Sequence, residues 1–101
     1  RFMVMPSRVE TFGMTLAEAN AAAKCTVIFD AAPMNEVAAP NSPRARAFDA
    51  ASLAAAIDQL HQLPDADLAQ QGALARQWAR RYNWDTVAAQ QEAFYLQACD
   101  A

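Results

Sequence analysis

Two short apolar runs lie near the start of the chain, Phe2-Met3-Val4-Met5 and the run from Thr26 to Asp30. Unbroken runs of this length fit strands that are buried on both faces of a parallel sheet. An Ala-rich stretch between them predicts a helix from Gly13 to Lys24. Strand, helix and strand together predict one right-handed βαβ crossover.

The stretch after the second run is rich in breakers. Residues 33–43 contain three prolines and an Asn-Ser pair, which predicts a loop from Pro33 to Pro43 with a short helical turn at Met34 to Ala38. Arg44 to Phe48 then reads as a short edge strand. The sheet should therefore have two or three strands.

The second half of the chain shows helical periodicity. Asp49 predicts an N-cap. Three helices are expected. The first has the apolar face Leu53, Ile57, Leu60 and Leu63, and the second, from Ala66 to Tyr82, has the apolar face Leu68, Ala75, Trp78 and Tyr82. Asn83 caps the third, whose inner side is Trp84, Val87, Ala88, Phe94, Tyr95 and Ala98. Trp78 and Trp84 are accordingly interpreted as packing residues.

The overall fold class is therefore a helix-dominated α/β domain. Alanine supplies 26 of the 101 residues, which favours helix wherever no breaker intervenes. A small parallel sheet leaves its edges open. We therefore expect residues 1–101 alone to be marginally stable, and to self-associate, swap strands or require further chain.

Charge and cysteine content exclude several classes of function. A net charge of −3 is of the wrong sign for a general nucleic-acid binder. No apolar run approaches the roughly 18 residues of a membrane span. Cys25 and Cys99 have no metal or redox spacing; a disulfide between them stays open, although a reduced cytosolic protein is the simpler interpretation. No metal cluster is expected around Asp30 and Glu36.

The most informative segment runs from Pro6 to Ala21 and joins the first strand to the first helix. Glu10 and Glu18 flank Gly13, which stands where loop becomes helix. A helix N-terminus has unpaired N–H groups and a positive dipole end, so it suits a phosphate. Gly13 lacks the Cβ that would hold a ligand off the backbone. One phosphate seat with a carboxylate on each side suits a nucleotide-sugar.

The string Pro-Ser-x-x-Glu-x-Phe-Gly-x-x-x-x-Glu-Ala resembles the Glu-x7-Glu signature of retaining, B-type (two-lobed) glycosyltransferases, the family 4-like members of the group 1 glycosyl transferases. Weaker similarity follows in chain order at residues 25–30, 31–37, 49–60 and 82–85. The resemblance implies that residues 1–101 form the C-terminal part of a nucleotide-sugar-binding, Rossmann-like lobe, and thus a fragment of a longer enzyme whose N-terminal lobe is missing.

The resemblance also implies an activity, namely retaining transfer of a hexose from a nucleoside diphosphate sugar to a saccharide or lipid-linked acceptor in polysaccharide or glycolipid synthesis. Glu10 would face the transferred sugar, as nucleophile or only to orient it and stabilise positive charge. Glu18 would bind the ribose. The remaining donor-binding residues would be Phe12, Gly13, Met14 and Thr15, with no metal and no cofactor besides the donor. The fragment alone should be inactive.

The implied location is the cytoplasm, with peripheral contact at the inner membrane. Arg76, Arg80 and Arg81 form a basic face that is either solvated or in contact with acidic headgroups. Phe12 admits a second interpretation, as a core plug beneath the loop rather than a stacking residue.

The chain also lacks features of the resembled family. Ala23 stands where a helix-ending glycine is usual, and Ala32-Pro33 replaces a Gly-Gly pair. Pro33 has no N–H to offer a donor. These changes motivate an alternative, a catalytically inactive helical interaction module that keeps the fold. A nucleotide-sugar hydrolase or epimerase is a third reading.

Overall fold

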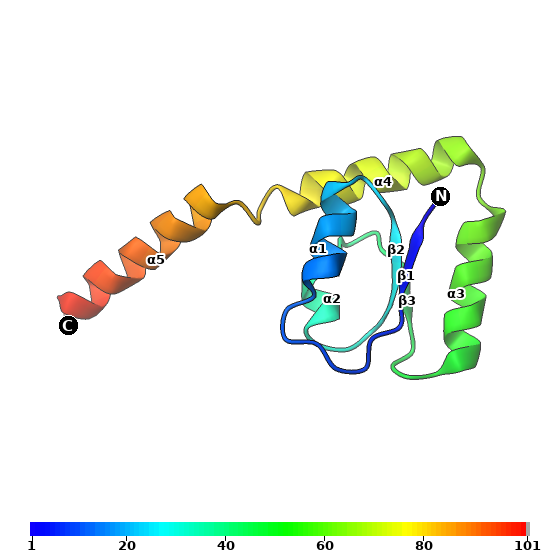
Figure 1. The fold of residues 1–101 in the computed structure, drawn as a ribbon, viewed down its shortest axis with the longest axis horizontal. Helices are drawn as coiled ribbons and strands as arrows, with labels where there is room; N and C mark the ends of the chain where they lie inside the picture. Colours follow the sequence, from blue (N-terminus) through cyan, green and yellow to red (C-terminus); the bar gives the residue numbers. More distant parts are fainter. Residues whose placement is uncertain (101) are drawn as a thin grey trace.

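The computed structural model describes residues 1–100 (Figure 1). Strands and helices follow one another as β1 (Met3–Met5), α1 (Met14–Ala21), β2 (Thr26–Phe29), α2 (Met34–Val37), β3 (Arg44–Ala45), α3 (Ala50–Gln62), α4 (Asp65–Ala79) and α5 (Trp84–Cys99). The chain is a helix-dominated α/β fold with a three-stranded parallel sheet, as the sequence predicts, and it is consistent with part of a Rossmann-like lobe.

The sheet has the strand order β1-β2-β3. Met5 of β1 pairs with Ile28 of β2, and Phe29 of β2 pairs with Ala45 of β3. All four residues of the central strand are buried. The edge strand ends at Ala45, earlier than the predicted Arg44–Phe48. The N–H of Arg46 donates to the hydroxyl of Ser52 rather than to β2, and Phe48 then has a φ of 63°, outside the extended region.

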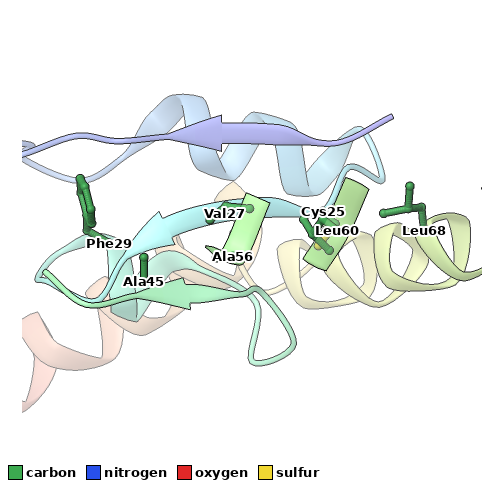
Figure 2. Close-up of a cluster of buried hydrophobic side chains, with 7 residues drawn as sticks. All are labelled: Cys25, Val27, Phe29, Ala45, Ala56, Leu60 and Leu68. Carbon is green, nitrogen blue, oxygen red and sulfur yellow. The ribbon is translucent and has the colours of Figure 1, made fainter. Parts of the chain in front are cut away.

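Helices cover both faces of the sheet (Figure 1), and each face carries its own buried cluster. Successive strand residues point to opposite faces. One cluster joins β2 to α3 and α4 through Cys25, Val27, Phe29, Ala45, Ala56, Leu60 and Leu68, as Figure 2 shows. The other joins the sheet to α1 and α2 through Met5, Leu16, Ile28, Met34, Val37 and Ala38. The predicted apolar face of α3 is confirmed, since Leu53, Ile57 and Leu63 also pack on the first cluster.

Helix α1 ends at Ala21, three residues before the predicted end. The N–H of Ala23 donates to the carbonyl of Asn20, and the N–H of Lys24 donates to that of Ala19. This is the Schellman arrangement, in which the residue after the cap is left-handed and usually glycine. Ala23 holds that position with a φ of 59°. The helix therefore ends in the conformation that usually needs a glycine, and the backbone of Ala23 is strained because alanine disfavours the left-handed region.

Helix α4 packs against α1 and the turn that follows it. Gly72 is buried there, and a Cβ added to it would lie 2.0 Å from the carbonyl oxygen of Ala23. The absence of a side chain at Gly72 thus sets how closely α4 approaches α1. Leu68 and Ala75 on the same helix are buried as predicted, and the Nε1–H of Trp78 donates to the carbonyl of Val37 at 3.1 Å.

Both predicted N-caps are confirmed. The carboxylate of Asp49 accepts from the N–H of Ser52 at the start of α3, and the side chain of Asn83 accepts from the N–H of Thr86 at the start of α5. Helix α4 ends at Ala79, so Tyr82 lies beyond it in the connection to α5 rather than on its last turn.

The predicted inner side of the last helix is wrong. Helix α5 projects from the body of the molecule (Figure 1, orange to red), and none of its residues is buried. Trp84 is 85% exposed and Phe94 is 65% exposed, which also corrects the interpretation of Trp84 as a packing residue. Among residues 1–100 the apolar residues of α5 therefore form no core with the body, and only those at its start, Trp84 and Val87, face α1 across a groove. Across residues 1–100, no helix has the length and apolar character to cross a membrane.

Candidate functional site

The candidate site lies at the carboxyl ends of the three parallel strands, the edge where open α/β sheets bind ligands. Residues 6–13 connect the end of β1 to α1 at this edge. The guanidinium of Arg8 in this loop lies 5.1 Å from the ring centre of Phe48, which follows β3. Loops from two strands therefore meet around the segment that the sequence singled out.

The N-terminus of α1 has the features of an anion seat. Its cap is Gly13, which provides no side-chain hydrogen bond, and the first turn holds no acidic residue. The N–H of Ala17 donates to the carbonyl of Gly13 at 3.1 Å and opens the helical ladder. The amides of Met14 and Thr15 precede that ladder, as the first amides of any α-helix do. Both residues are exposed, so the positive end of the helix faces solvent.

The structure gives Gly13 a different role from the one that the sequence suggested. Its φ of 94° is left-handed, and a Cβ there would lie 2.8 Å from the Sδ of Met34 on α2. That Cβ direction points into the protein. Glycine is therefore required for the backbone conformation that positions the helix start, and it also leaves room for the side chain of Met34.

The two carboxylates of the motif lie in different settings. Glu10 is half-buried in the loop, and its Oε1 accepts from the hydroxyl of Ser7 at 3.3 Å. Glu18 is exposed in the second turn of α1. It lies four residues after Met14, so the two share a helix face. Ser7 restrains Glu10, whereas Glu18 is free to reach a ligand seated at the helix start.

Phe12 is not the core plug that one reading of the sequence predicted. It is 38% exposed, and its ring meets that of Tyr82 edge-on with 5.6 Å between centroids. The two rings help line a groove of about 680 Å³ between α1 and the start of α5. The full lining is Phe12, Met14, Ala17, Arg81, Tyr82, Asn83, Trp84, Thr86, Val87 and Gln90. Sequence reasoning missed this groove, although the aromatic residues on both sides of Asn83 were a signal for it.

The loop after β2 offers few amides to a ligand. The N–H of Ala31 already donates to the carbonyl of Phe29 at 2.9 Å, and Pro33 has none. A side-chain bond from Asn35 to Asp30 at 3.3 Å spans the loop. Position 33 thus has no backbone donor to offer at this edge, whereas the N-terminus of α1 keeps its own.

The described residues offer neither a metal-binding cluster nor a reactive thiol in the core. In the part of the chain that the structure describes, no three His, Cys, Asp or Glu side chains gather as a metal would need. Cys25 is buried and Cys99 is exposed, and both are free thiols. Burial raises the pKa of the Cys25 thiol above its ordinary value of 9.0, against a smaller opposing effect of a backbone hydrogen bond at Thr26. A thiol held protonated in the core is a poor nucleophile.

Comparison with known proteins bears on the same segment. The sequence model of the family described as glycosyl transferases group 1 matches residues 1–78, from β1 into α4. No curated protein and no solved structure matches the chain. The match includes the whole strand–loop–helix unit with Glu10, Gly13 and Glu18, and it covers more than half of the 101 residues. The chain therefore belongs to the glycosyl transferases group 1 family.

Proposed function

We propose that this chain is the donor-binding portion of a retaining glycosyltransferase, which transfers a hexose from a nucleoside diphosphate sugar to a saccharide or lipid-linked acceptor. The observation that carries the proposal is the uncapped, exposed N-terminus of α1 at the carboxyl edge of the sheet. Membership of the glycosyl transferase family supports glycosyl transfer in general. We infer a nucleoside diphosphate sugar as donor because the anion seat has a carboxylate on each side.

The role of the α1 terminus is to bind the diphosphate. When the bond between the sugar C1 and the phosphate oxygen breaks, the electron pair leaves with the nucleoside diphosphate. The amides of Met14 and Thr15 and the positive end of the helix stabilise that charge. No metal is needed for this step.

Glu18 and Glu10 contact the two sugars of the donor, the ribose and the transferred hexose. Glu18 shares a helix face with Met14 and accepts hydrogen bonds from the ribose hydroxyls. Glu10, restrained by Ser7, faces the transferred hexose. There it orients the sugar and stabilises the positive charge that develops at C1, or attacks C1 itself and forms a covalent intermediate. In the first case the acceptor hydroxyl bonds to C1 as the diphosphate leaves, and its proton passes to the leaving phosphate oxygen. In the second case the acceptor hydroxyl displaces the Glu10 carboxylate, which takes back the electron pair of its bond to C1, and the proton passes to the bound diphosphate.

The test is a comparison of nucleoside diphosphate affinity between variants. We expect Glu18→Ala to weaken binding by about 1–3 kcal/mol, the loss of a charged hydrogen bond, or roughly 5- to 150-fold. Asp58→Ala is the matched control, because Asp58 is an exposed helical carboxylate on α3, away from the site. Equal affinities for the wild type and both variants would contradict the role of Glu18.

Glu10 is tested with two ligands rather than one. Glu10→Gln should leave the affinity for the nucleoside diphosphate unchanged and weaken that for the corresponding nucleoside diphosphate hexose, because only the second ligand has the sugar that Glu10 faces. If Glu10→Gln weakened both ligands equally, Glu10 would instead support the loop or the phosphate seat.

A further inference from the structure

Arg8 extends across the carboxyl edge of the sheet. It lies in the loop from β1 to α1, whereas the aromatic ring next to its guanidinium is that of Phe48, which follows β3. The guanidinium carbon lies 5.1 Å from the ring centre, within the roughly 6 Å of a cation–π contact. Because β2 lies between β1 and β3, this contact connects the loops of the two outer strands, which are about 10 Å apart.

Phe48 holds that guanidinium from a fixed position. Its φ of 63° is left-handed, a conformation that bulky residues seldom adopt and that is concentrated at functional sites. Its ring packs edge-on against Phe29 at the end of β2, with 5.6 Å between the centroids. Phe29 is buried, whereas Phe48 is 42% exposed. The core therefore fixes the ring, and the ring holds Arg8 at the surface.

Arg8 differs from the other charged residues of this edge in having no polar partner. The loops after β1, β2 and β3 contain four others, and each is paired: Glu10 with the hydroxyl of Ser7, Asp30 with the Nδ2 of Asn35, and Arg46 with Asp49. Among residues 1–100, the guanidinium of Arg8 contacts an aromatic ring but has no hydrogen bond and no ion pair. Its side chain is exposed, so its N–H donors are available to a ligand.

We propose that Arg8 binds the carboxylate of a hexuronic acid and makes the site selective for an acidic sugar. The inference rests on the proposed function, in which the diphosphate binds at the start of α1 and Glu10 faces the hexose. Arg8 precedes Glu10 by two residues, and the phosphate seat follows Glu10 at Gly13. This order matches that of carboxylate, hexose and diphosphate in a nucleoside diphosphate hexuronate.

The chemistry of the guanidinium favours a carboxylate. Its planar fork donates paired, parallel hydrogen bonds to a carboxylate. Contact with Phe48 orients the side chain before the ligand arrives, which lowers the entropic cost of binding. A cation that served the diphosphate would be expected beside Gly13, rather than on the other side of Glu10 from it. The carboxylate can belong to the transferred sugar or to the sugar of the acceptor, and the two sources are distinguished below.

The first test measures the affinity of the chain for UDP, UDP-glucose and UDP-glucuronate, and for GDP, GDP-mannose and GDP-mannuronate. We expect the wild type to bind the uronate of one series about tenfold more tightly than its neutral counterpart. Arg8→Gln should abolish this preference and leave the affinity for the nucleoside diphosphate unchanged. Arg76→Gln is the matched control, because Arg76 is an exposed arginine on α4, and it should alter neither quantity.

Two further variants test how Arg8 is held. Arg8→Lys keeps the charge without the planar fork, and Phe48→Leu removes the aromatic face but keeps an apolar side chain. Both should leave a preference between that of the wild type and that of Arg8→Gln. If Phe48→Leu lowered the melting temperature without changing the ratio of the two affinities, Phe48 would be a packing residue only, and the proposed orientation of Arg8 would be wrong.

The second test identifies the source of the carboxylate. Methyl glucuronoside and methyl glucoside are titrated into the chain with the nucleoside diphosphate that binds, chosen from UDP, GDP and ADP, already at saturation. An Arg8-dependent preference among the free glycosides alone would assign the acidic sugar to the acceptor. The same preference among the nucleotide sugars alone would assign it to the donor.

Failure of this inference is distinguishable from failure of the proposed function. If a nucleoside diphosphate binds but Arg8→Gln removes no preference in either test, the role of Arg8 is overturned and the donor seat at α1 stands. If Arg8→Gln weakens the nucleoside diphosphate itself, Arg8 contacts the diphosphate and the inference is overturned as well. If none of UDP, GDP and ADP binds, the proposed function fails, and the role of Arg8 fails with it.

Discussion

Replacing Gly72 by alanine has two opposing effects on stability, a gain in helix propensity and a steric clash with a neighbouring turn. In an isolated helix the change would stabilise by about 1 kcal/mol, because alanine is the better helix former. In this molecule the new Cβ would lie 2.0 Å from the carbonyl oxygen of Ala23, whereas real Cβ atoms essentially never come within 3.0 Å of such an atom. The opposing atom is backbone, so α4 or the turn after α1 must move by at least about 1 Å.

The cost of that movement exceeds the helical gain. Overpacking of a well-packed site costs about 1–3 kcal/mol, and a backbone partner that cannot rotate away places this site at the upper end. About 3 kcal/mol less about 1 kcal/mol leaves Gly72→Ala destabilised by roughly 2 kcal/mol. For a domain of this size that lowers the melting temperature by about 10 °C.

Thermal unfolding followed by circular dichroism measures this effect. The control is Ala73→Gly at the adjacent, exposed position of α4, which should destabilise by about 1 kcal/mol through helix propensity alone. An unchanged or higher melting temperature for Gly72→Ala would refute the close approach of α4 to the turn after α1.

Three further predictions follow from other parts of the fold. Ala23→Gly should raise the free energy of unfolding by about 0.5–1 kcal/mol in urea titrations, because it relieves a left-handed alanine; a loss of stability would contradict the strain. Burial raises the pKa of the Cys25 thiol above 9.0, so the contribution of the protonated thiol to the free energy of unfolding is complete at lower pH and is lost as the pH rises through the folded-state pKa. The free energy of unfolding of the wild type should therefore fall more steeply above pH 9.0 than that of Cys25→Ala. Parallel pH curves for the two proteins would contradict the raised pKa. Asp49→Ala and Asn83→Ala both remove an N-cap. The first should lower the free energy of unfolding of the body by about 1 kcal/mol, whereas the second should lower only the helix content, because no residue of α5 is buried. Equal losses in the free energy of unfolding would show that α5 packs on the body.

The local parts of this fold were predictable from the sequence. Both N-caps, at Asp49 and Asn83, follow from a side chain and an amide three residues apart, so short-range chemistry decides them. The parallel strands follow from unbroken apolar runs. The strand–loop–helix placement of Glu10 and Glu18 was predictable for the same reason, since it depends on order along the chain.

Features that depend on a distant partner were not predictable. The apolar residues of α5 indicate a helix face, but no periodicity tells whether the same chain covers it. The role of Gly13 depends on Met34 of another helix, which is adjacent only in three dimensions. The edge contact of Phe12 with Tyr82 joins residues 70 positions apart. Whether Glu10 and Glu18 bind one ligand belongs to this class too, and it stays a prediction.

The central claim, that the start of α1 is the donor seat, is tested most directly by NMR titration of the isotopically labelled chain with UDP, GDP and ADP. We predict that one of the three shifts the amides of Gly13, Met14, Thr15 and Glu18 more than any others, and that inorganic pyrophosphate shifts Met14 and Thr15 but not Glu18. If a well-dispersed spectrum showed no shift at millimolar ligand, or shifts confined to other elements, the assignment of this site would be contradicted.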